Sequence, residues 1–342
     1  MLTNKIFEFY ALYIWPVLRL FVKRSKRCRL CILSEKYSPL IDGLCPECAK
    51  LASHVGKSSG AHHSSPALEL SLIEKARFET VIHSYVNEKN YHALLLLSGG
   101  KDSAYILHRM KQDFPELKIL CLIVNNGFMS PFAINAAKVL AEKMITDLLV
   151  VNDKIDEFAR VLRRAFLELK GQGSYGVVDH ADGTLIFKTA KQIANEMKIR
   201  LVISGLSWVQ VQRIVGENSF EVVTPDEPHE VFPLAVWRTS EQDIRSYVRS
   251  HELLPPGSDS PLLSNSSLIL SMAVIDILNL GYSSFEPEFA QLIRERKSDR
   301  RTWLHSFELL EFGTRYGILK KAAEANLRLL KLSLKDIVKE TL

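Results

Sequence analysis

Short apolar runs alternate along the chain with longer segments in which apolar residues recur every three or four positions. The runs have the length and flanking turn residues of buried β-strands, and the longer segments have the period of amphipathic helices. The expected strands are residues 91–97, 118–125, 147–152 and 200–204. The expected helices are residues 67–90, 104–112, 131–145, 154–170 and 184–197. This alternation predicts an α/β fold, a doubly wound parallel sheet with helices on both faces.

Changes in composition divide the chain into five parts. An apolar and then basic stretch comes first, two cysteine pairs follow, and a polar glycine- and serine-rich stretch separates them from the α/β pattern. The expected parts are an N-terminal segment at 1–27, a cysteine module at 28–51, a linker at 52–66, the α/β domain at 67–250 and a helical C-terminal region at 251–342. His62 and His63 in the linker are expected to be solvated rather than to bind a metal.

Residues 2–22 are dominated by apolar and aromatic side chains, and a basic run follows them. Glu8, Pro16 and Arg19 interrupt the stretch, which makes it a poor membrane-spanning helix, and no small-residue cleavage site marks a signal peptide. Two interpretations stay open. The segment is an interfacial helix that touches a membrane, or it is a helix packed on the body of the protein or on a partner subunit. The sequence favours the second.

The composition is that of a soluble globular protein, with 47% hydrophobic and 24% charged residues in a chain of 342. The net charge of +5 tolerates an acidic or phosphorylated partner but does not require nucleic acid. The 5 cysteines are few for this length, and C-x-x-C pairs account for most of them, so a disulfide framework is not expected. These features predict a cytoplasmic protein, associated with a membrane if residues 2–22 touch one.

The strongest chemical signal is the sequence Ser98-Gly-Gly-Lys-Asp-Ser103, which lies between the first expected strand and a helix. This arrangement brings free backbone N–H groups and the positive end of a helix to one point, which suits a phosphate. Gly99 and Gly100 allow the backbone to approach the anion and to take dihedrals closed to other residues. Lys101 supplies a positive charge, Asp102 is suited to hold Mg²⁺ or to cap the helix, and the two serines offer hydroxyls to the same anion.

Polar and glycine residues also follow the second expected strand, at Asn125–Gly127, and the fourth, at Ser204–Gly205. The carboxyl ends of parallel strands share one edge of a sheet, and ligands bind there near the point where the strand order reverses. The sequence therefore predicts a nucleotide site built from these two strand ends and the Ser98–Ser103 loop.

Four cysteines in two pairs precede the linker. Cys28 and Cys31 form the first pair, Cys45 and Cys48 form the second, and Gly43 supplies a turn just before the second pair. Each pair can present two thiolates from one tight turn, and together they fill all four positions of a tetrahedral zinc site. The pattern predicts a zinc knuckle with a structural Zn²⁺ and no position left open for catalysis.

The Ser98–Ser103 sequence in its strand–turn–helix setting resembles the signature of the PP-loop ATP pyrophosphatases, and it lacks the spacing of a Walker A motif. Enzymes of that family grip the β,γ-pyrophosphate of ATP and transfer AMP to a substrate oxygen. The resemblance implies that ATP and Mg²⁺ bind at Ser98, Gly99, Gly100, Lys101, Asp102 and Ser103, with the last three catalytic. It also implies that the backbone around Asn125, Gly127 and Gly205 meets adenosine.

Within this family, the order of the two cysteine pairs ahead of the loop looks like the N-terminal part of the N-acetyl sugar amidotransferases. The segment Val124–Phe128 after the second strand is also similar to theirs. The resemblance implies a sugar or nucleotide-sugar substrate in surface-polysaccharide biosynthesis, a nitrogen nucleophile, and ammonia from a separate glutaminase subunit, since the chain shows no glutaminase nucleophile. A homo-oligomer is compatible with the sequence.

Two other functions compete with amidotransfer. The tRNA thiolases also carry zinc pairs and this loop, and many of them use catalytic cysteines, so tRNA is the alternative substrate. Only Cys121 lies outside the two pairs here, and its place within a buried strand predicts an unreactive thiol. The second alternative is a non-catalytic nucleotide-binding subunit of a membrane-linked complex. The complete Ser98–Ser103 sequence argues against this interpretation.

Two further regions carry polar residues without a defined role. The long loop expected at Gly171–Thr184 contains Asp179, His180 and Asp182, which would either line a substrate pocket or, from Asp182 to Thr184, cap the following helix. A basic cluster lies in the C-terminal region and would either touch phosphate or, as the sequence favours, form a solvated helix face. The cluster consists of Arg294, Arg296, Lys297, Arg300 and Arg301.

Overall fold

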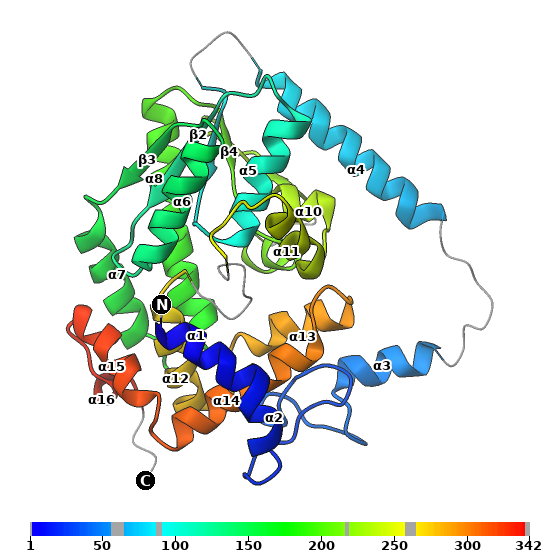
Figure 1. Ribbon diagram of the computed structural model, residues 1–342, viewed down its shortest axis with the longest axis vertical. Helices are drawn as coiled ribbons and strands as arrows, with labels where there is room; N and C mark the ends of the chain where they lie inside the picture. Colours follow the sequence, from blue (N-terminus) through cyan, green and yellow to red (C-terminus); the bar gives the residue numbers. More distant parts are fainter. Residues whose placement is uncertain (1, 56–64, 87–90, 216–218, 257–264, 339–342) are drawn as a thin grey trace. The chain divides into compact units, whose positions relative to one another are not determined.

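The computed structural model describes residues 2–55, 65–86, 91–215, 219–256 and 265–338 (Figure 1). The chain forms two compact units, each assembled from separate stretches of sequence. Unit 1 comprises Met1–Gly60, Ile155–Gly183 and Pro261–Leu342, and unit 2 comprises Ala61–Lys154 and Thr184–Ser260. Residues 155–183 thus group with the N- and C-terminal parts, although the sequence analysis placed them inside 67–250. Most of the expected linker at 52–66, with His62 and His63, lies outside the described residues.

A six-stranded sheet forms the centre of unit 2, in the order β3-β2-β1-β4-β6-β5. All neighbouring pairs are parallel except β5 with β6. The strands are β1 (Ala93–Leu96), β2 (Ile119–Val124), β3 (Leu148–Val151), β4 (Leu201–Ile203), β5 (Glu221–Val222) and β6 (His229–Val231). The doubly wound, mostly parallel sheet expected from the sequence is confirmed. Strands β5 and β6 were not expected from the sequence, because Glu221–Val222 and His229–Val231 contain charged or polar residues and do not form an apolar run as β4 does.

Unit 2 contains helices before, between and after these strands (Figure 1). They are α4 (Ser65–Ser84), α5 (Lys101–Asp113), α6 (Pro131–Lys143), α9 (Trp208–Gln210), the π-helix η3 (Val211–Val215), α10 (Pro233–Trp237) and α11 (Glu241–Ser250). Helix α8 (His180–Glu196) begins in unit 1 and continues into unit 2. Each predicted helix of the α/β pattern is present, with ends that differ by a few residues.

Both faces of the sheet are buried, as the unbroken apolar runs predicted. Leu95, Cys121 and Ile203 belong to one cluster with side chains of α4, α5, α6 and α11. Leu94 and Val202 point to the opposite face, because side chains alternate along a strand, and both are fully buried. A parallel sheet covered on both faces leaves its carboxyl edge as the place for polar chemistry.

Within its described residues, unit 1 consists of helices and short irregular segments. Its helices are α1 (Leu2–Phe9), the π-helix η1 (Tyr10–Ile14), α2 (Trp15–Leu18), α3 (Pro46–Val55), α7 (Ile155–Leu167), the π-helix η2 (Tyr175–Asp179), α12 (Leu268–Leu280), α13 (Glu286–Arg294), α14 (Arg300–Arg315), α15 (Lys320–Leu329) and α16 (Leu334–Ile337). The helical C-terminal region expected from the sequence is therefore present as α12 to α16.

The stretch 171–184, expected as a loop, is largely helical. The π-helix η2 runs directly into α8, so Asp182 and Thr184 lie inside α8 rather than capping its start, and the capping interpretation is wrong. The carboxylate of Asp276 on α12 anchors this stretch, because it accepts hydrogen bonds from the backbone N–H groups of Ser174 at 2.8 Å and Ser284 at 2.9 Å. That the polar residues of 171–184 line a substrate pocket stays a prediction.

The N-terminal segment (residues 2–22) packs on α14 through one face. Ala11 and Trp15 are buried, the Trp15 ring lies 5.2 Å from that of Phe312, and its indole N–H donates to Glu308 Oε2 at 2.9 Å. The guanidinium of Arg19 donates two hydrogen bonds to the same carboxylate, at 2.7 and 2.8 Å. The sequence had favoured packing on the body of the protein, and these contacts show it. Among the described residues, no helix has both the length and the apolar character needed to cross a membrane.

Acid is expected to loosen the attachment of the N-terminal segment. Burial would raise the pKa of Glu308, but hydrogen bonds from Arg19 and Trp15 and the charges of Arg19 and Arg24 hold the pKa of this carboxyl below its ordinary value. Its contribution to stability is therefore present above about pH 4.3, the value in an unfolded chain, and is lost as the pH falls through the lower folded value. Tryptophan fluorescence and thermal melting across this range would report the loss.

The matched control for this titration is Glu308→Gln, which keeps the shape of the side chain and removes its charge. Its overall stability is expected to fall, because Arg19 would lose a charged partner, but its dependence on acidic pH should flatten. An unchanged pH profile in the variant would show that another group controls the acid response.

Candidate functional site

The Ser98–Ser103 loop joins β1 to α5. Gly99 has φ of +72°, and a Cβ added there would lie 2.0 Å from the carbonyl oxygen of Ala133 in α6. Gly100 has φ of −100° and is the N-cap of α5, so its backbone is open to other residues. The helix begins at Lys101, three residues earlier than the sequence predicted, and Lys101, Asp102 and Ser103 form its first turn. The requirement for glycine therefore falls on Gly99.

Replacing Gly99 by alanine is expected to destabilise unit 2 by about 3 kcal/mol and to weaken nucleotide binding. The positive φ and the collision with backbone in α6 both oppose a side chain, and backbone cannot yield as a flexible side chain can. Chemical denaturation and nucleotide titration would measure the two effects.

Gly183→Ala is the matched control, because the space around a Cβ at this position in α8 is open. A helix interior prefers alanine to glycine by about 1 kcal/mol. The control should therefore match or exceed the stability of the unmodified chain. Equal stability of Gly99→Ala and Gly183→Ala would show that the loop does not need its tight approach to α6.

Hydrogen bonds within the loop fix its polar side chains. The hydroxyls of Ser98 and Ser103 lie 3.1 Å apart, and that of Ser103 also donates to the carbonyl of Gly100 at 3.1 Å. Lys101 Nζ donates to both carboxylate oxygens of Asp102, at 2.8 and 3.1 Å. The lysine and the carboxylate therefore neutralise one another, and each is placed to turn to a ligand of opposite charge.

Lys101 keeps its positive charge although it is largely buried, with 18% of its side chain exposed. Burial would lower the pKa of this amine, but the charges of Asp102 and Glu241 outweigh it and raise the pKa above its ordinary value. Arg245 acts in the opposite direction, which places a second cation close to the lysine. The Nε atom of Arg245 is buried and has no hydrogen-bond partner among the described residues.

Neither Glu241 nor Arg245 was expected near the loop from the sequence. Both lie on α11, which packs against α5 although more than a hundred residues separate them. Nothing in their local sequence distinguishes them from other charged residues of an amphipathic helix. Only the packing of α11 on α5 brings them to the Ser98–Ser103 loop.

The ends of β2 and β4 flank the end of β1, since these three strands are neighbours in the sheet. A Cβ added to Gly205 would lie 3.9 Å from the backbone N of Ser103 and 3.6 Å from Ile106, so the end of β4 meets the first turn of α5. Ser204, just before it, is buried, and its hydroxyl has no hydrogen-bond partner among the described residues. The end of β4 thus adds a polar group beside the loop.

The end of β2 is braced by asparagines. Asn125 Nδ2 donates to Asn152 Oδ1 at 2.9 Å, and Asn125 Oδ1 accepts from the backbone N–H of Gly127 at 3.0 Å. Gly127 has φ of +84°, which favours glycine. Asn125–Gly127 therefore forms a fixed turn at the carboxyl edge. Together with Gly205 it flanks the Ser98–Ser103 loop at the switch point of the sheet, and adenosine binding by these residues stays a prediction.

The four cysteines of the two pairs converge on one point. Cys28, Cys31, Cys45 and Cys48 are buried, and their sulfur atoms all lie within 4.8 Å of one another, with those of Cys31 and Cys45 3.7 Å apart. Zinc–sulfur bonds of about 2.3 Å in a tetrahedron separate the sulfurs by about 3.8 Å. The donor set and its spacing therefore fit a single tetrahedral Zn²⁺.

The cysteine module is built on the C-terminal helices. The guanidinium of Arg300, at the start of α14, donates to the carbonyl oxygens of Cys31 at 2.7 Å and Cys28 at 2.9 Å. Phe307 of α14 and Ala290 of α13 belong to the same hydrophobic cluster as the cysteines. The solvated face expected of the basic cluster is therefore wrong for Arg300, which holds the two turns that carry the thiols.

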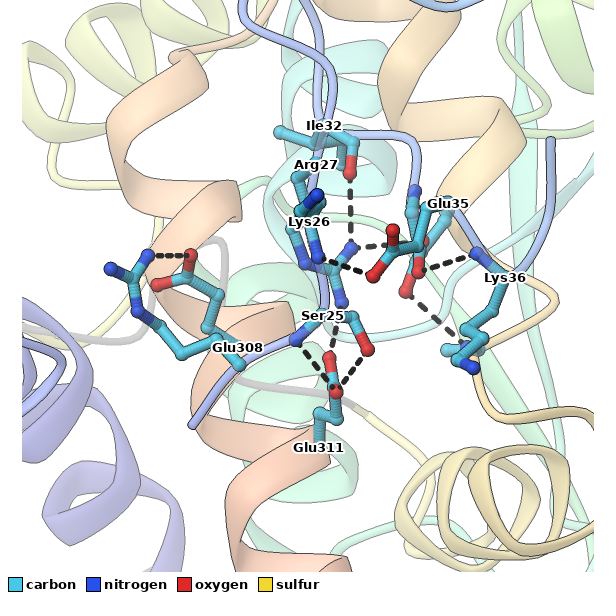
Figure 2. Close-up of polar contacts among 12 residues, drawn as sticks. Ser25, Lys26, Arg27, Ile32, Glu35, Lys36, Glu308 and Glu311 are labelled. Carbon is cyan, nitrogen blue, oxygen red and sulfur yellow. Dashed lines mark hydrogen bonds and ion pairs between the residues drawn. The ribbon is translucent and has the colours of Figure 1, made fainter. Parts of the chain in front are cut away.

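A buried ionic network continues from the module into α13 and α14 (Figure 2). The guanidinium of Arg27 lies 2.9 Å from Glu286 and 3.1 Å from Glu311, and its side chain also donates to the carbonyl of Ile32 at 3.0 Å. Ser25 donates its hydroxyl to Glu311 at 2.6 Å. Since each charged group is paired, the network fixes the cysteine module on the helices rather than leaving it tethered by a linker.

No protein-family model matches the chain. A curated relative, the uncharacterized protein MJ1599 of Methanocaldococcus jannaschii, is 27% identical over 144 residues, which represent 40% of this chain and 47% of the relative. The chain therefore spans about half the length of the curated relative that it matches.

Solved structures with detectable similarity include three enzymes. The U34-tRNA thiolase NcsA of Methanococcus maripaludis, solved with its [4Fe-4S] cluster, has a TM-score of 0.40 and 15% identity over 90% of this chain and 89% of that one. Phosphoadenylyl-sulfate reductase of Candida auris has a TM-score of 0.36 and 16% identity, over 66% of this chain and 95% of that one. NMN synthetase of Francisella tularensis has a TM-score of 0.43 and 14% identity, over 72% of this chain and 94% of that one. These values are too low to support a conclusion on ligands or activity.

Proposed function

We propose that this protein is an enzyme that cleaves ATP to AMP and pyrophosphate while it adenylates an acceptor. The observation that carries the proposal is the Ser98–Ser103 loop at the switch point of the sheet. Its first turn of helix points backbone N–H groups at the carboxyl edge and carries Lys101, and Arg245 on α11 is close enough to lower the pKa of that lysine, while Asp102 and Glu241 raise it. This combination suits a pyrophosphate, which carries several negative charges close together.

The reaction follows from these groups and from the chemistry of ATP. A carbonyl oxygen of the acceptor attacks the α-phosphorus, the bond from that phosphorus to the bridging oxygen breaks, and pyrophosphate leaves with the electron pair. Lys101, Arg245 and the loop N–H groups stabilise the charge that develops on the leaving group. Asp102 would hold Mg²⁺, which neutralises phosphate charge when bound. The protein aligns the reacting groups and neutralises the charge of the phosphates, so no covalent enzyme intermediate is needed.

The acceptor proposed is an N-acetyl sugar or its nucleotide derivative, as an intermediate of surface-polysaccharide synthesis. Support comes from the two cysteine pairs ahead of the loop and from Val124–Phe128, both similar to the N-acetyl sugar amidotransferases. The adenylated carbon of the acetamido group then accepts ammonia, AMP leaves, and an acetamidino group remains. A separate glutaminase subunit would supply the ammonia.

The thiols of the chain argue against sulfur transfer through an enzyme persulfide. Cys121 is buried, and burial raises the pKa of its thiol to about 12. The other four cysteines are buried together in the metal-binding group. A persulfide carrier needs a thiol that is accessible and readily ionised. Transfer of sulfur to tRNA is therefore the alternative outcome of the experiment rather than a second proposal.

The test uses the zinc-loaded protein with labelled ATP and Mg²⁺, against a panel of N-acetylated nucleotide sugars with ammonia and bulk tRNA with a sulfur donor. AMP and pyrophosphate that appear only with a sugar acceptor would support both the adenylation reaction and the sugar acceptor. AMP that appears with tRNA and a sulfur donor would retain adenylation and reject the sugar acceptor. Production of ADP, or tight ATP binding without turnover across the panel, would reject adenylation and favour a nucleotide-binding subunit.

A further inference from the structure

The N-terminal segment exposes a continuous row of large apolar side chains. Phe9, Tyr13, Val17 and Phe21 follow one another at intervals of four residues and are 53, 67, 62 and 81% exposed. Further exposed apolar residues occur at helical spacing beside this row, at Ile6, Tyr10, Ile14 and Leu20. Such a run of exposed aromatic and aliphatic side chains exceeds the single exposed residues common on protein surfaces, and it marks an interaction surface.

The opposite face of the same segment fixes its orientation. Ala11 and Trp15 are buried against α14, and Arg19 is bonded to Glu308 there. Because these contacts hold the inner face, the segment cannot turn to bury its outer row without leaving α14. The outer row is therefore exposed on the surface of unit 1 rather than buried in a hydrophobic core.

The charge around this row is mainly positive, with Glu8 at its start and Glu35 just beyond its basic end. No acidic residue occurs between Phe9 and Ser34, whereas the same stretch contains Arg19, Lys23, Arg24, Lys26, Arg27 and Arg29. Lys23 and Lys26 are exposed. The carboxylates that the segment meets on α14, those of Glu308 and Glu311, are buried and paired with arginines, whereas Glu35 lies close to Lys26 and accepts from its backbone N–H at 2.9 Å.

We propose that the outer row and the adjacent lysines dock unit 1 on an anionic lipid surface. An amphipathic segment with aromatic residues on one side and basic residues at its end lies in the plane of a membrane interface. Tyrosine is favoured at that depth, and each nearby lysine is attracted to the negative surface. A symmetric contact with a second copy is disfavoured, because it would bring two identical basic clusters together.

The experiment is flotation of the zinc-loaded protein with vesicles. Phosphatidylcholine vesicles are compared with vesicles that also contain phosphatidylglycerol. Strong binding is expected only to the anionic vesicles, and it should weaken with added salt. An apolar variant, Tyr13→Ser with Val17→Ser and Phe21→Ser, and a charge variant, Lys23→Gln with Lys26→Gln, are each expected to lower the partition coefficient by about tenfold or more.

Matched controls remove equal numbers of exposed groups elsewhere. Ile145→Ser with Val223→Ser and Leu329→Ser changes three exposed apolar residues, and Lys75→Gln with Lys335→Gln removes two exposed lysines. Both controls should bind anionic vesicles as the unmodified chain does. Absence of binding to anionic vesicles at low salt would overturn the proposal. So would an apolar variant that binds vesicles normally but dissociates a dimer in light scattering, because a second copy would then cover the row.

Discussion

Replacement of Lys101 by alanine is expected to lower acceptor-dependent AMP formation by about 1,000-fold, as the loss of one group that stabilises developing charge does in other enzymes. The amine of Lys101 is a cation in the first turn of α5, and within the described part of the chain its side-chain hydrogen bonds go to Asp102. Its removal should therefore spare the fold. Steady-state kinetics with a sugar acceptor would measure the effect, and thermal melting would confirm that the variant is folded.

Lys75→Ala is the matched control for the loss of a lysine, since Lys75 is exposed on α4 and lies outside the loop. It should keep full activity. Lys101→Arg is informative as well, because a guanidinium retains the charge but not the compact shape of an ammonium. Turnover by Lys101→Ala close to that of the unmodified protein would remove the pyrophosphate assignment of the loop, however well the variant bound ATP.

Replacement of Cys28 or Cys45 by serine is expected to release the metal and to destabilise unit 1 by about 3 kcal/mol or more. The free energy of binding a structural zinc ion is also free energy of folding, because the site does not exist in the unfolded chain. Metal analysis of the unmodified protein should give about one zinc ion per chain and no visible absorption from an iron–sulfur cluster. Melting with and without a chelator would report the stability.

The matched control is Cys121→Ala, which changes the fifth cysteine in β2. It should keep its metal and lose only the stability expected from a small cavity in the core. Iron in place of zinc, with cluster absorption that disappears in Cys28→Ser, would contradict the single-ion geometry. A metal content that does not change in Cys28→Ser or Cys45→Ser would show that these thiols are not ligands.

The local structure that the sequence predicted correctly is set by neighbouring residues. Ser98–Gly100 connects a strand to a helix because apolar residues on either side and a glycine pair within it leave few other arrangements. The cysteine pairs likewise converge because each C-x-x-C already forms half of a tetrahedron. Their chemistry is local, so a short window of sequence was enough to find it.

The parts that the sequence did not predict depend on contacts between distant residues. Arg245 comes near Lys101 only through the packing of α11 on α5, and Arg300 holds the cysteine turns from the start of α14. The stretch 171–184 was expected as a loop because it contains several glycines. The buried carboxylate of Asp276, a hundred residues later, fixes the start of that stretch, and its second half lies within helices.

The sequence by itself determined the alternation of strands and helices, the glycine turn after β1 and the two C-x-x-C pairs whose thiols are proposed to bind zinc. The tertiary structure decided which charges surround that turn, where the cysteine module is anchored and which face of the N-terminal segment stays exposed. The physical reason is the distance along the chain over which each interaction acts. Periodicity and turn chemistry act over a few residues, whereas the pairing of buried charges such as Arg27 with Glu286 and Glu311 is fixed only when distant helices pack.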